Sequence, residues 1–177
     1  MAILKVAKLG HPITRAVAQP VPLEAIQTKE FQGFIDDMIE TIHEYDGVGL
    51  AATQVHVPAQ IAVLEVQGNP RYPRAPEVPL TVLINPKIVS ASKERVEDWE
   101  GCLSVIDFRG KVPRHREVKV QAYDREGKPL QFTAKDFHAR VIQHECDHLN
   151  GKVFLDRMPS LETLTYLAEF ARYWQGR

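Results

Sequence analysis

The sequence predicts an α+β fold in which antiparallel β-sheets pack around a central helix carrying a His-Glu-x-x-His motif, with one further helix N-terminal and another C-terminal. Three observations support this class. Apolar residues recur at helical spacing in three separate segments. Short β-branched or alternating segments fill the middle of the chain, and Asp124–Gly127 joins two of them as a hairpin turn. The 177 residues suffice for one domain with its own hydrophobic core.

The elements follow in order from the N-terminus. Residues 1–24 contain prolines that forbid a long helix, so we expect an irregular arm. A helix is predicted over 31–43, where apolar residues recur at spacings of three and four. The β-branched segment 61–66 is a predicted strand, and the proline-rich segment 69–79 is an exposed loop. Later predicted elements are strands over 81–84, 87–90, 95–99, 118–123 and 129–133, the motif helix over 134–150, and a terminal helix over 161–174.

The predicted motif helix has recognisable ends. Thr133, with Asp136 three residues later, resembles a capping box, and Gly151 fits a C-cap. Cys146 projects away from the face that carries the motif histidines, which predicts a buried structural thiol. Asp147 is expected either to orient a metal ligand or to form a salt bridge on the helix surface.

Composition excludes several kinds of partner. The 22 Lys and Arg residues nearly balance 23 Asp and Glu, giving a net charge of −1, and no basic block predicts direct nucleic-acid binding. No apolar run is long enough for a membrane span, and the N-terminus lacks a signal-peptide pattern. We therefore predict a cytoplasmic protein of bacterial type without a membrane partner, and a processed organellar form stays open. Its two cysteines would be reduced and able to bind metal.

The motif itself is the strongest chemical signal. His144 and His148 are four residues apart on the predicted helix, so both imidazoles can face one metal ion. Glu145 lies beside the first histidine and can act as a base toward a water held by that ion. The alternative is a pair of histidines on a solvated helix face.

A third metal ligand is required, because two histidines hold a catalytic metal poorly. A metzincin is excluded, since its third histidine position is Phe154. Glu162 or Glu169 would make the chain a small metalloendoprotease. Cys102 would instead complete a Cys-His-His site that keeps one coordination position for water. A closed site with four protein ligands, in a non-catalytic zinc-binding module, is a further alternative.

Three segments carry a resemblance to a known family. Gly47–Gln54, Glu100–Ser104 and Gln143–His148 resemble, in order and spacing, the signature motifs of peptide deformylase. Residues 9–12 and the predicted helix over 31–43 resemble the N-terminal half of that family. The resemblance covers nearly the whole chain. It implies a hydrolase of protein biosynthesis that removes the N-formyl group from the N-terminal methionine of newly synthesised peptides.

The resemblance also implies roles for individual residues. Glu145 would be the general acid/base, and the Gln54 side chain and the Leu103 backbone N–H would be the oxyanion donors. The implied cofactor is one divalent metal ion, Fe²⁺ in the cell, which Zn²⁺, Ni²⁺ or Co²⁺ can replace. Its implied ligands are Cys102, His144 and His148.

Substrate contacts are expected along the same motifs. Glycines would let an extended peptide lie alongside and pair as an added strand, and Phe137 and Val141 would wall a methionine pocket. The full predicted set is Val48, Gly49, Gly101, Arg109, Phe137 and Val141. The chain departs from the family where Ile106 replaces the usual proline and where the loop 70–79 is longer. The implied partners are N-formyl-methionyl nascent peptides, and transient association with the ribosome stays open.

Overall fold

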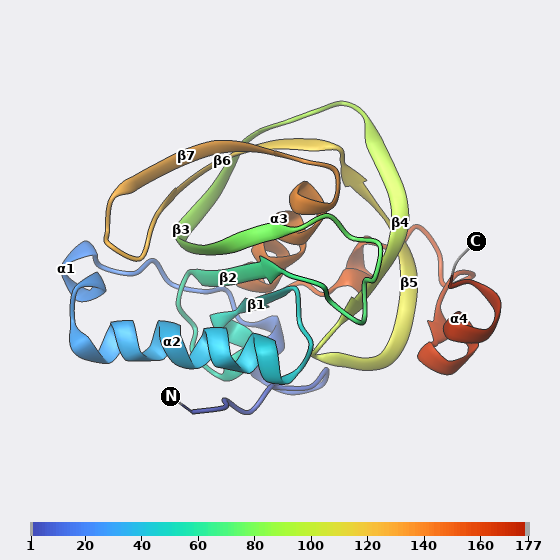
Figure 1. Ribbon diagram of the computed structural model, residues 1–177, viewed down its shortest axis with the longest axis horizontal. Helices are drawn as coiled ribbons and strands as arrows, with labels where there is room; N and C mark the ends of the chain where they lie inside the picture. Colours follow the sequence, from blue (N-terminus) through green and yellow to red (C-terminus); the bar gives the residue numbers. More distant parts are fainter. Residues whose placement is uncertain (1, 176–177) are drawn as a thin grey trace.

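The computed structural model describes residues 2–175, which form a mixed fold of two antiparallel sheets and a few helices (Figure 1). This confirms the predicted combination of helices with antiparallel sheets. The larger sheet has the order β1-β2-β3-β6-β7, formed by Gly49–Ala51, Ile61–Val66, Val78–Ala91, Glu117–Tyr123 and Pro129–Lys135. The smaller sheet has the order β4-β5-β8, formed by Arg95–Cys102, Val105–His115 and Thr165–Tyr166.

Helices lie on both sides of the larger sheet. In Figure 1, α2 runs along the lower left, next to β1 and β2, and α3 lies behind the strands. The short α4 lies at the far end, beyond β5. The α-helices are α1 (Leu23–Ile26), α2 (Lys29–Glu44), α3 (Asp136–Leu149) and α4 (Leu167–Tyr173), and 3-10 turns η1, η2 and η3 cover Pro12–Arg15, Ala52–Val55 and Phe154–Arg157.

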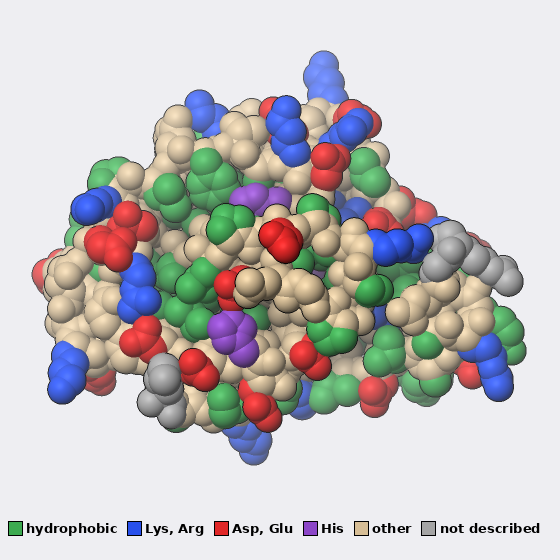
Figure 2. Space-filling model, in the orientation of Figure 1, with side chains coloured by type: hydrophobic (Ala, Val, Ile, Leu, Met, Phe, Trp, Pro, Cys, Tyr) green, Lys and Arg blue, Asp and Glu red, His purple; other side chains and the backbone are tan. Residues whose placement is uncertain are grey.

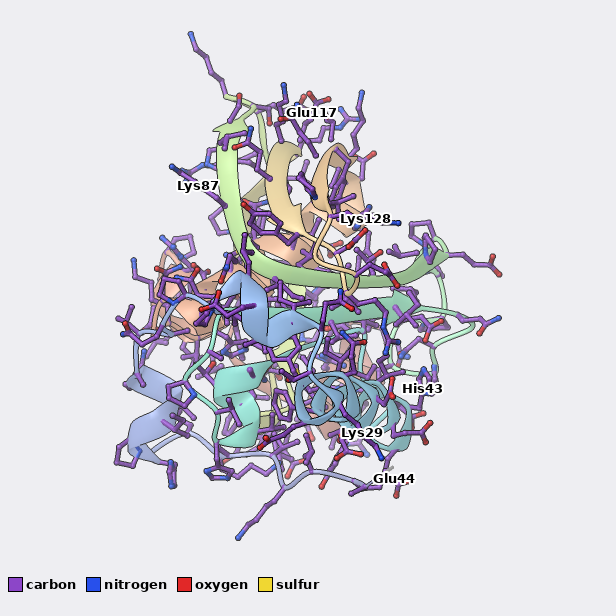
Figure 3. The ribbon with its side chains drawn as sticks, turned by 90° about the vertical axis from the view of Figure 1, so that its left-hand side faces the viewer. Lys29, His43, Glu44, Lys87, Glu117 and Lys128 are labelled. Carbon is purple, nitrogen blue, oxygen red and sulfur yellow. The ribbon has the colours of Figure 1, made fainter. Side chains whose placement is uncertain are left out.

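Helix α2 agrees with the amphipathic segment predicted over 31–43. Thr28 caps it by accepting a hydrogen bond from the Phe31 N–H. Its apolar face is buried against the β1–β2 side of the larger sheet, where it forms the first hydrophobic core. Its polar face points outward, and Figure 3 shows Lys29, His43 and Glu44 along it. The same figure places Lys87, Glu117 and Lys128 on the strands and hairpin of the upper half.

Helix α3 contacts strands of both sheets and forms a second core with β2, β3, β6 and β7. It begins at Asp136, two residues later than predicted, because Thr133 and Ala134 still pair with Lys119 and Val118 in the β6–β7 ladder. The predicted capping box is therefore wrong, and no side chain caps the helix. The predicted C-terminal end is right.

Gly151 terminates helix α3 at its C-terminal end. It has φ +68°, in the left-handed region that glycine adopts readily, and its N–H donates to the His148 carbonyl at 3.1 Å. Cys146 is partly buried as a residue, so the prediction of a buried structural thiol is met in part. It packs against the rim of the second core.

Two further predictions differ from the structure, and one strand had no prediction. The two strands predicted around Asn85–Pro86 are one strand, β3, whose pairing with β6 is irregular between Ile84 and Lys87. Asn85 accommodates the break with φ +52° and side-chain hydrogen bonds to the backbone of Val21. Strand β5 was not predicted. The terminal helix begins at residue 167 instead of 161, because the residues just before it form β8 against β5.

The surface carries no dominant charge on the face shown in Figure 2, where acidic and basic side chains are interspersed. This agrees with the balanced composition. Within residues 2–175, no helix is both long and apolar enough to cross a membrane.

The second core makes a testable contribution to stability. Ile142 on α3 is fully buried in it. We expect Ile142→Ala to lower the free energy of unfolding by about 2–5 kcal/mol, through lost transfer energy and the cavity left behind. Urea denaturation of the metal-loaded protein measures this. Ile106→Ala is the matched control, because Ile106 is 50% exposed and its truncation should change stability by less than about 0.5 kcal/mol.

Candidate active site

Three segments distant in sequence meet at one buried site. Helix α3 presents His144 and His148 one turn apart on the same face. Cys102 is the last residue of β4, paired with Val105 across a tight turn, which places its thiol against α3. One ligand atom from each of these three residues lies within 4.8 Å of the other two, and all three residues are buried.

The three potential ligand atoms converge closely. Cys102 Sγ lies 3.1 Å from His148 Nε2, which lies 3.2 Å from His144 Nε2. Burial alone would raise the pKa of the Cys102 thiol, but the adjacent rings of His148 and His144 hold that pKa well below its ordinary value. At Cys146, by contrast, burial raises the pKa to about 12. Only Cys102 is therefore placed to act as a thiolate near neutral pH.

A buried carboxylate orients the first histidine. Glu100 Oε2 lies 2.9 Å from His144 Nδ1, which places the ring proton on Nδ1 and leaves Nε2 with a free lone pair. Glu100 also accepts hydrogen bonds from Arg114 at 2.9 and 3.0 Å and from Arg140 at 2.8 Å. Although burial opposes it, hydrogen bonds from His144 and Arg114 keep the pKa of Glu100 below its usual value. The carboxylate thus stays charged.

The network extends to Asp147, which also belongs to α3. Asp147 accepts hydrogen bonds from Arg114 and from Arg157, with Arg157 Nε to Asp147 Oδ2 at 3.0 Å. It does not contact a histidine directly. Asp147 therefore forms salt bridges, as one of the two predictions had it, but is itself buried. It also holds Arg114, which binds Glu100. Sequence reasoning missed Glu100, Arg114 and Arg140, since their partners lie 14 to 44 residues away.

The role of Glu100 can be measured through metal affinity. We expect Glu100→Gln to weaken Zn²⁺ or Ni²⁺ binding by roughly 10- to 100-fold, because carboxylates that orient a histidine ligand typically contribute this much. Titration against a chelator of known affinity measures the change. Glu97→Gln is the matched control, since Glu97 lies exposed on the same strand. Unchanged affinity in Glu100→Gln would contradict the orienting role.

Glu145 faces the same space. Its side chain is buried, which raises the pKa of the carboxyl group, and Oε2 has no hydrogen-bond partner among residues 2–175. A buried oxygen of this kind normally has a partner, so it is available to a water or substrate group. Gly49 makes room for it, because a Cβ at that position would lie 2.8 Å from Glu145 Cδ.

Gln54 and Leu103 lie next to Cys102. The Gln54 carbonyl oxygen accepts the Ala51 N–H at 2.9 Å, which turns the amide NH₂ toward Ser104 Oγ at 3.2 Å and Cys102 Sγ at 3.5 Å. The side chain is buried and held at both ends. Leu103 belongs to the tight turn that follows Cys102, and its carbonyl accepts a hydrogen bond from Lys8 Nζ at 3.0 Å.

The predicted substrate residues divide between two hollows. Val48, Gly49, Gly101, Phe137 and Val141 line an inner cavity of about 30 Å³ together with Gln54, Cys102, Leu103, His144 and Glu145. Arg109 does not line it. Arg109 is buried beneath Tyr72 and lines an adjoining outer hollow of about 350 Å³. Ile106 is 50% exposed ahead of Arg109, and Arg109 is fixed in β5 by pairing with Thr165.

The donor set fits a metal ion. A thiolate and two imidazoles are typical ligands for Fe²⁺, Zn²⁺, Ni²⁺ or Co²⁺. No fourth Cys, His, Asp or Glu from residues 2–175 joins the group, which argues against a closed structural site. Glu162 and Glu169 are exposed and lie outside it. The alternative in which either one completes a protease site is therefore not supported.

Ligands for one metal beside a buried carboxylate are the arrangement with which hydrolases activate water, and the chain belongs to the class of metal-dependent hydrolases. Comparison with known families makes the class specific. Residues 3–164 match the model of the polypeptide deformylase family, so the chain belongs to this family. The predicted resemblance is thus confirmed. The reaction of the family is hydrolytic removal of the N-formyl group from nascent peptides.

Individual relatives agree over most of the chain. Peptide deformylase 1 of Bordetella pertussis is 45% identical over 161 residues, which are 91% of this chain and 90% of that protein. Peptide deformylase 2 of Nostoc sp. is 46% identical over 164 residues, 92% of this chain and 90% of that protein. The Met-Ala-Ser-bound crystal structure of class I type b peptide deformylase from Acinetobacter baumannii has a TM-score of 0.86 at 39% identity, covering 89% and 99% of the two chains.

Proposed function

We propose that this chain deformylates N-formyl-methionyl peptides with Glu145 as general acid/base and with Cys102, His144 and His148 holding one divalent metal. The observation that carries the proposal is the buried Glu145 carboxylate, with an unpartnered oxygen, beside the three converging ligand atoms. In this account α3 is the central helix of the fold and residues 1–177 form a single catalytic domain. Fe²⁺ is the proposed ion in the cell.

The metal, when bound, supplies a Lewis acid that makes water a nucleophile near neutral pH. Glu145 accepts a proton as that water attacks the formyl carbon. The carboxyl group then donates the proton to the nitrogen as the carbon–nitrogen bond breaks, so formate and a free methionyl amine leave. The raised pKa of Glu145 suits a group that must both take up and release a proton.

Two donors are available for the negative charge that develops on the formyl oxygen. Gln54 offers a fixed NH₂ group, since its carbonyl end is held by the Ala51 N–H. The Leu103 backbone N–H comes from the turn next to Cys102. Removing one such donor costs roughly 3 kcal/mol of transition-state stabilisation in other enzymes.

The peptide would lie between two sheet edges. Gly49 in β1 and Gly101 in β4 line the inner cavity from opposite sheets, and a peptide can pair with such backbone as an added strand. Phe137 and Val141 would then contact the methionine side chain and Val48 the peptide beside it. Arg109 would act at the outer hollow on residues further along.

The proposal also covers where the protein acts. Formyl-methionyl chains arise where bacterial-type ribosomes translate, so we place the reaction in the cytoplasm, with transient association near the ribosome. The balanced charge supports proposing neither a nucleic-acid nor a membrane partner.

Amine release from formyl-Met-Ala-Ser tests the function. Protein prepared anaerobically with Fe²⁺ should release one free amine and one formate for each peptide cleaved, whereas acetyl-Met-Ala-Ser should react far more slowly. A metal-loaded preparation that releases no amine from the formyl peptide would overturn the proposal.

A further inference from the structure

The proline-rich loop that precedes β3 contributes a side chain to the inner cavity. Tyr72 stands on this loop, and its ring centroid lies 5.3 Å from that of Phe137. Its hydroxyl accepts a hydrogen bond from the Gly101 N–H at 3.2 Å and from Arg109 Nη1 at 3.0 Å. The Arg109 guanidinium also lies 4.9 Å from the Tyr72 ring centroid, as in a cation–π contact.

In this contact, the Gly101 N–H is the group that matters for binding of the peptide. The register of the β4–β5 pairing shifts between Glu100 and Cys102, so Gly101 lies in an irregularity of this ladder. Its N–H donates to the Tyr72 hydroxyl, and Gly101 lines the inner cavity. A peptide carbonyl would accept the same N–H if the substrate adds as a strand. In the structure, the Tyr72 hydroxyl already accepts a hydrogen bond from this N–H.

Tyr72 lies between the two hollows. It lines both the inner cavity of about 30 Å³ and the outer hollow of about 350 Å³, as do Arg71, Trp99, Phe137 and Arg140. Since one water needs roughly 10–15 Å³ of such space, the inner cavity takes about two waters. A methionine side chain is larger and needs the wall to move.

The loop is held at its base and free of sheet pairing at its tip. Asn69 is buried, and its Nδ2 donates to the carbonyls of Asp46 and Gly47, both at 2.9 Å. Beyond it, the backbone N–H groups of Tyr72 and Ala75 make only turn hydrogen bonds before β3 begins at Val78. Tyr72 can thus move while the base of the loop stays in place.

We propose that Tyr72 controls access of the peptide, because its hydroxyl competes with a substrate carbonyl for the Gly101 N–H and its ring closes the passage between the two hollows. This inference rests on the proposed function, since it takes the inner cavity as the site of the methionine. Tyr72 would determine the affinity for the peptide and would not change the rate of the chemical step.

Tyr72→Phe tests the competition, because it removes the hydroxyl and keeps the ring. We expect KM for formyl-Met-Ala-Ser and Kd for the product Met-Ala-Ser both to fall about fivefold, the effect of one hydrogen bond, with kcat changed less than about twofold. Tyr173→Phe is the matched control, since Tyr173 is exposed on α4 and lines neither hollow. Unchanged or weaker binding of both peptides by Tyr72→Phe would overturn the inference.

Tyr72→Ala tests whether the ring closes the passage between the two hollows. Loss of the ring should join the two hollows, so KM for formyl-Met-Ala-Ser and Kd for Met-Ala-Ser should fall at least as much as in Tyr72→Phe. A rise in both constants would show that Tyr72 is a fixed part of the peptide site. The Met-Ala-Ser measurement needs no turnover. A wild-type protein that binds Met-Ala-Ser but releases no amine from the formyl peptide would refute the proposed function, while the comparison of variants would still decide the role of Tyr72.

Discussion

Glu145→Gln is expected to lower kcat for formyl-Met-Ala-Ser by roughly 10²–10⁴-fold, the usual contribution of a general acid/base. Glutamine has nearly the same shape, so the fold and the three ligand atoms should stay in place. It cannot accept the proton from water or donate one to the leaving amine. The rate of amine release, measured at equal metal content, gives the effect.

Metal content is the necessary companion measurement. Glu145→Gln should retain one ion per chain, because Glu145 is outside the ligand group. Glu162→Gln and Glu169→Gln are matched controls, since both side chains are exposed, and both variants should keep full activity. Wild-type activity in Glu145→Gln would remove the acid/base role.

Cys102→Ala should have the largest effect on metal binding. Two histidines alone remain, and a site with two protein ligands holds a divalent ion poorly. We expect the affinity for Zn²⁺ to fall by more than roughly 100-fold, beyond the loss typical for residues that only orient a ligand. Amine release should fall with it. Chelator competition and metal analysis measure the change.

The second cysteine provides the control for this experiment. Cys146 lies on the other side of α3, and burial raises the pKa of its thiol to about 12. Cys146→Ala should therefore bind metal like the wild type. Equal losses in the two variants would contradict the distinct role of Cys102. Tight metal binding by Cys102→Ala would do so as well.

Local sequence signals predicted those parts of the fold that local physics determines. Helix α2 and strand β2 were predictable because their apolar residues follow one period and their ends are marked. Strand β5 was not, since it is interrupted by Gly110 and Pro113 and is buried on parts of both faces. The start of α3 was predicted too early because pairing with β6 keeps Ala134 in a strand.

The residues of the candidate site also fall into those that local sequence predicts and those that it does not. The spacing of His144 and His148 follows from one helix, so the sequence predicts their shared face directly. Cys102 was one of three candidates for the third ligand, with Glu162 and Glu169, and only the family resemblance selected it, because its approach to α3 depends on the smaller sheet. Nothing local marks Glu100 as a partner of His144, or Tyr72 as a partner of Gly101, since each contact joins separate elements.

X-ray absorption at the metal edge of the Zn²⁺-loaded protein tests the coordination most directly. A site formed by Cys102, His144 and His148 should show one sulfur at about 2.3 Å, two imidazole nitrogens at about 2.0–2.1 Å and one further light atom from solvent. The sulfur contribution should vanish in Cys102→Ala and persist in Cys146→Ala. A spectrum without sulfur, or one with four ligands all from protein side chains, would contradict this coordination.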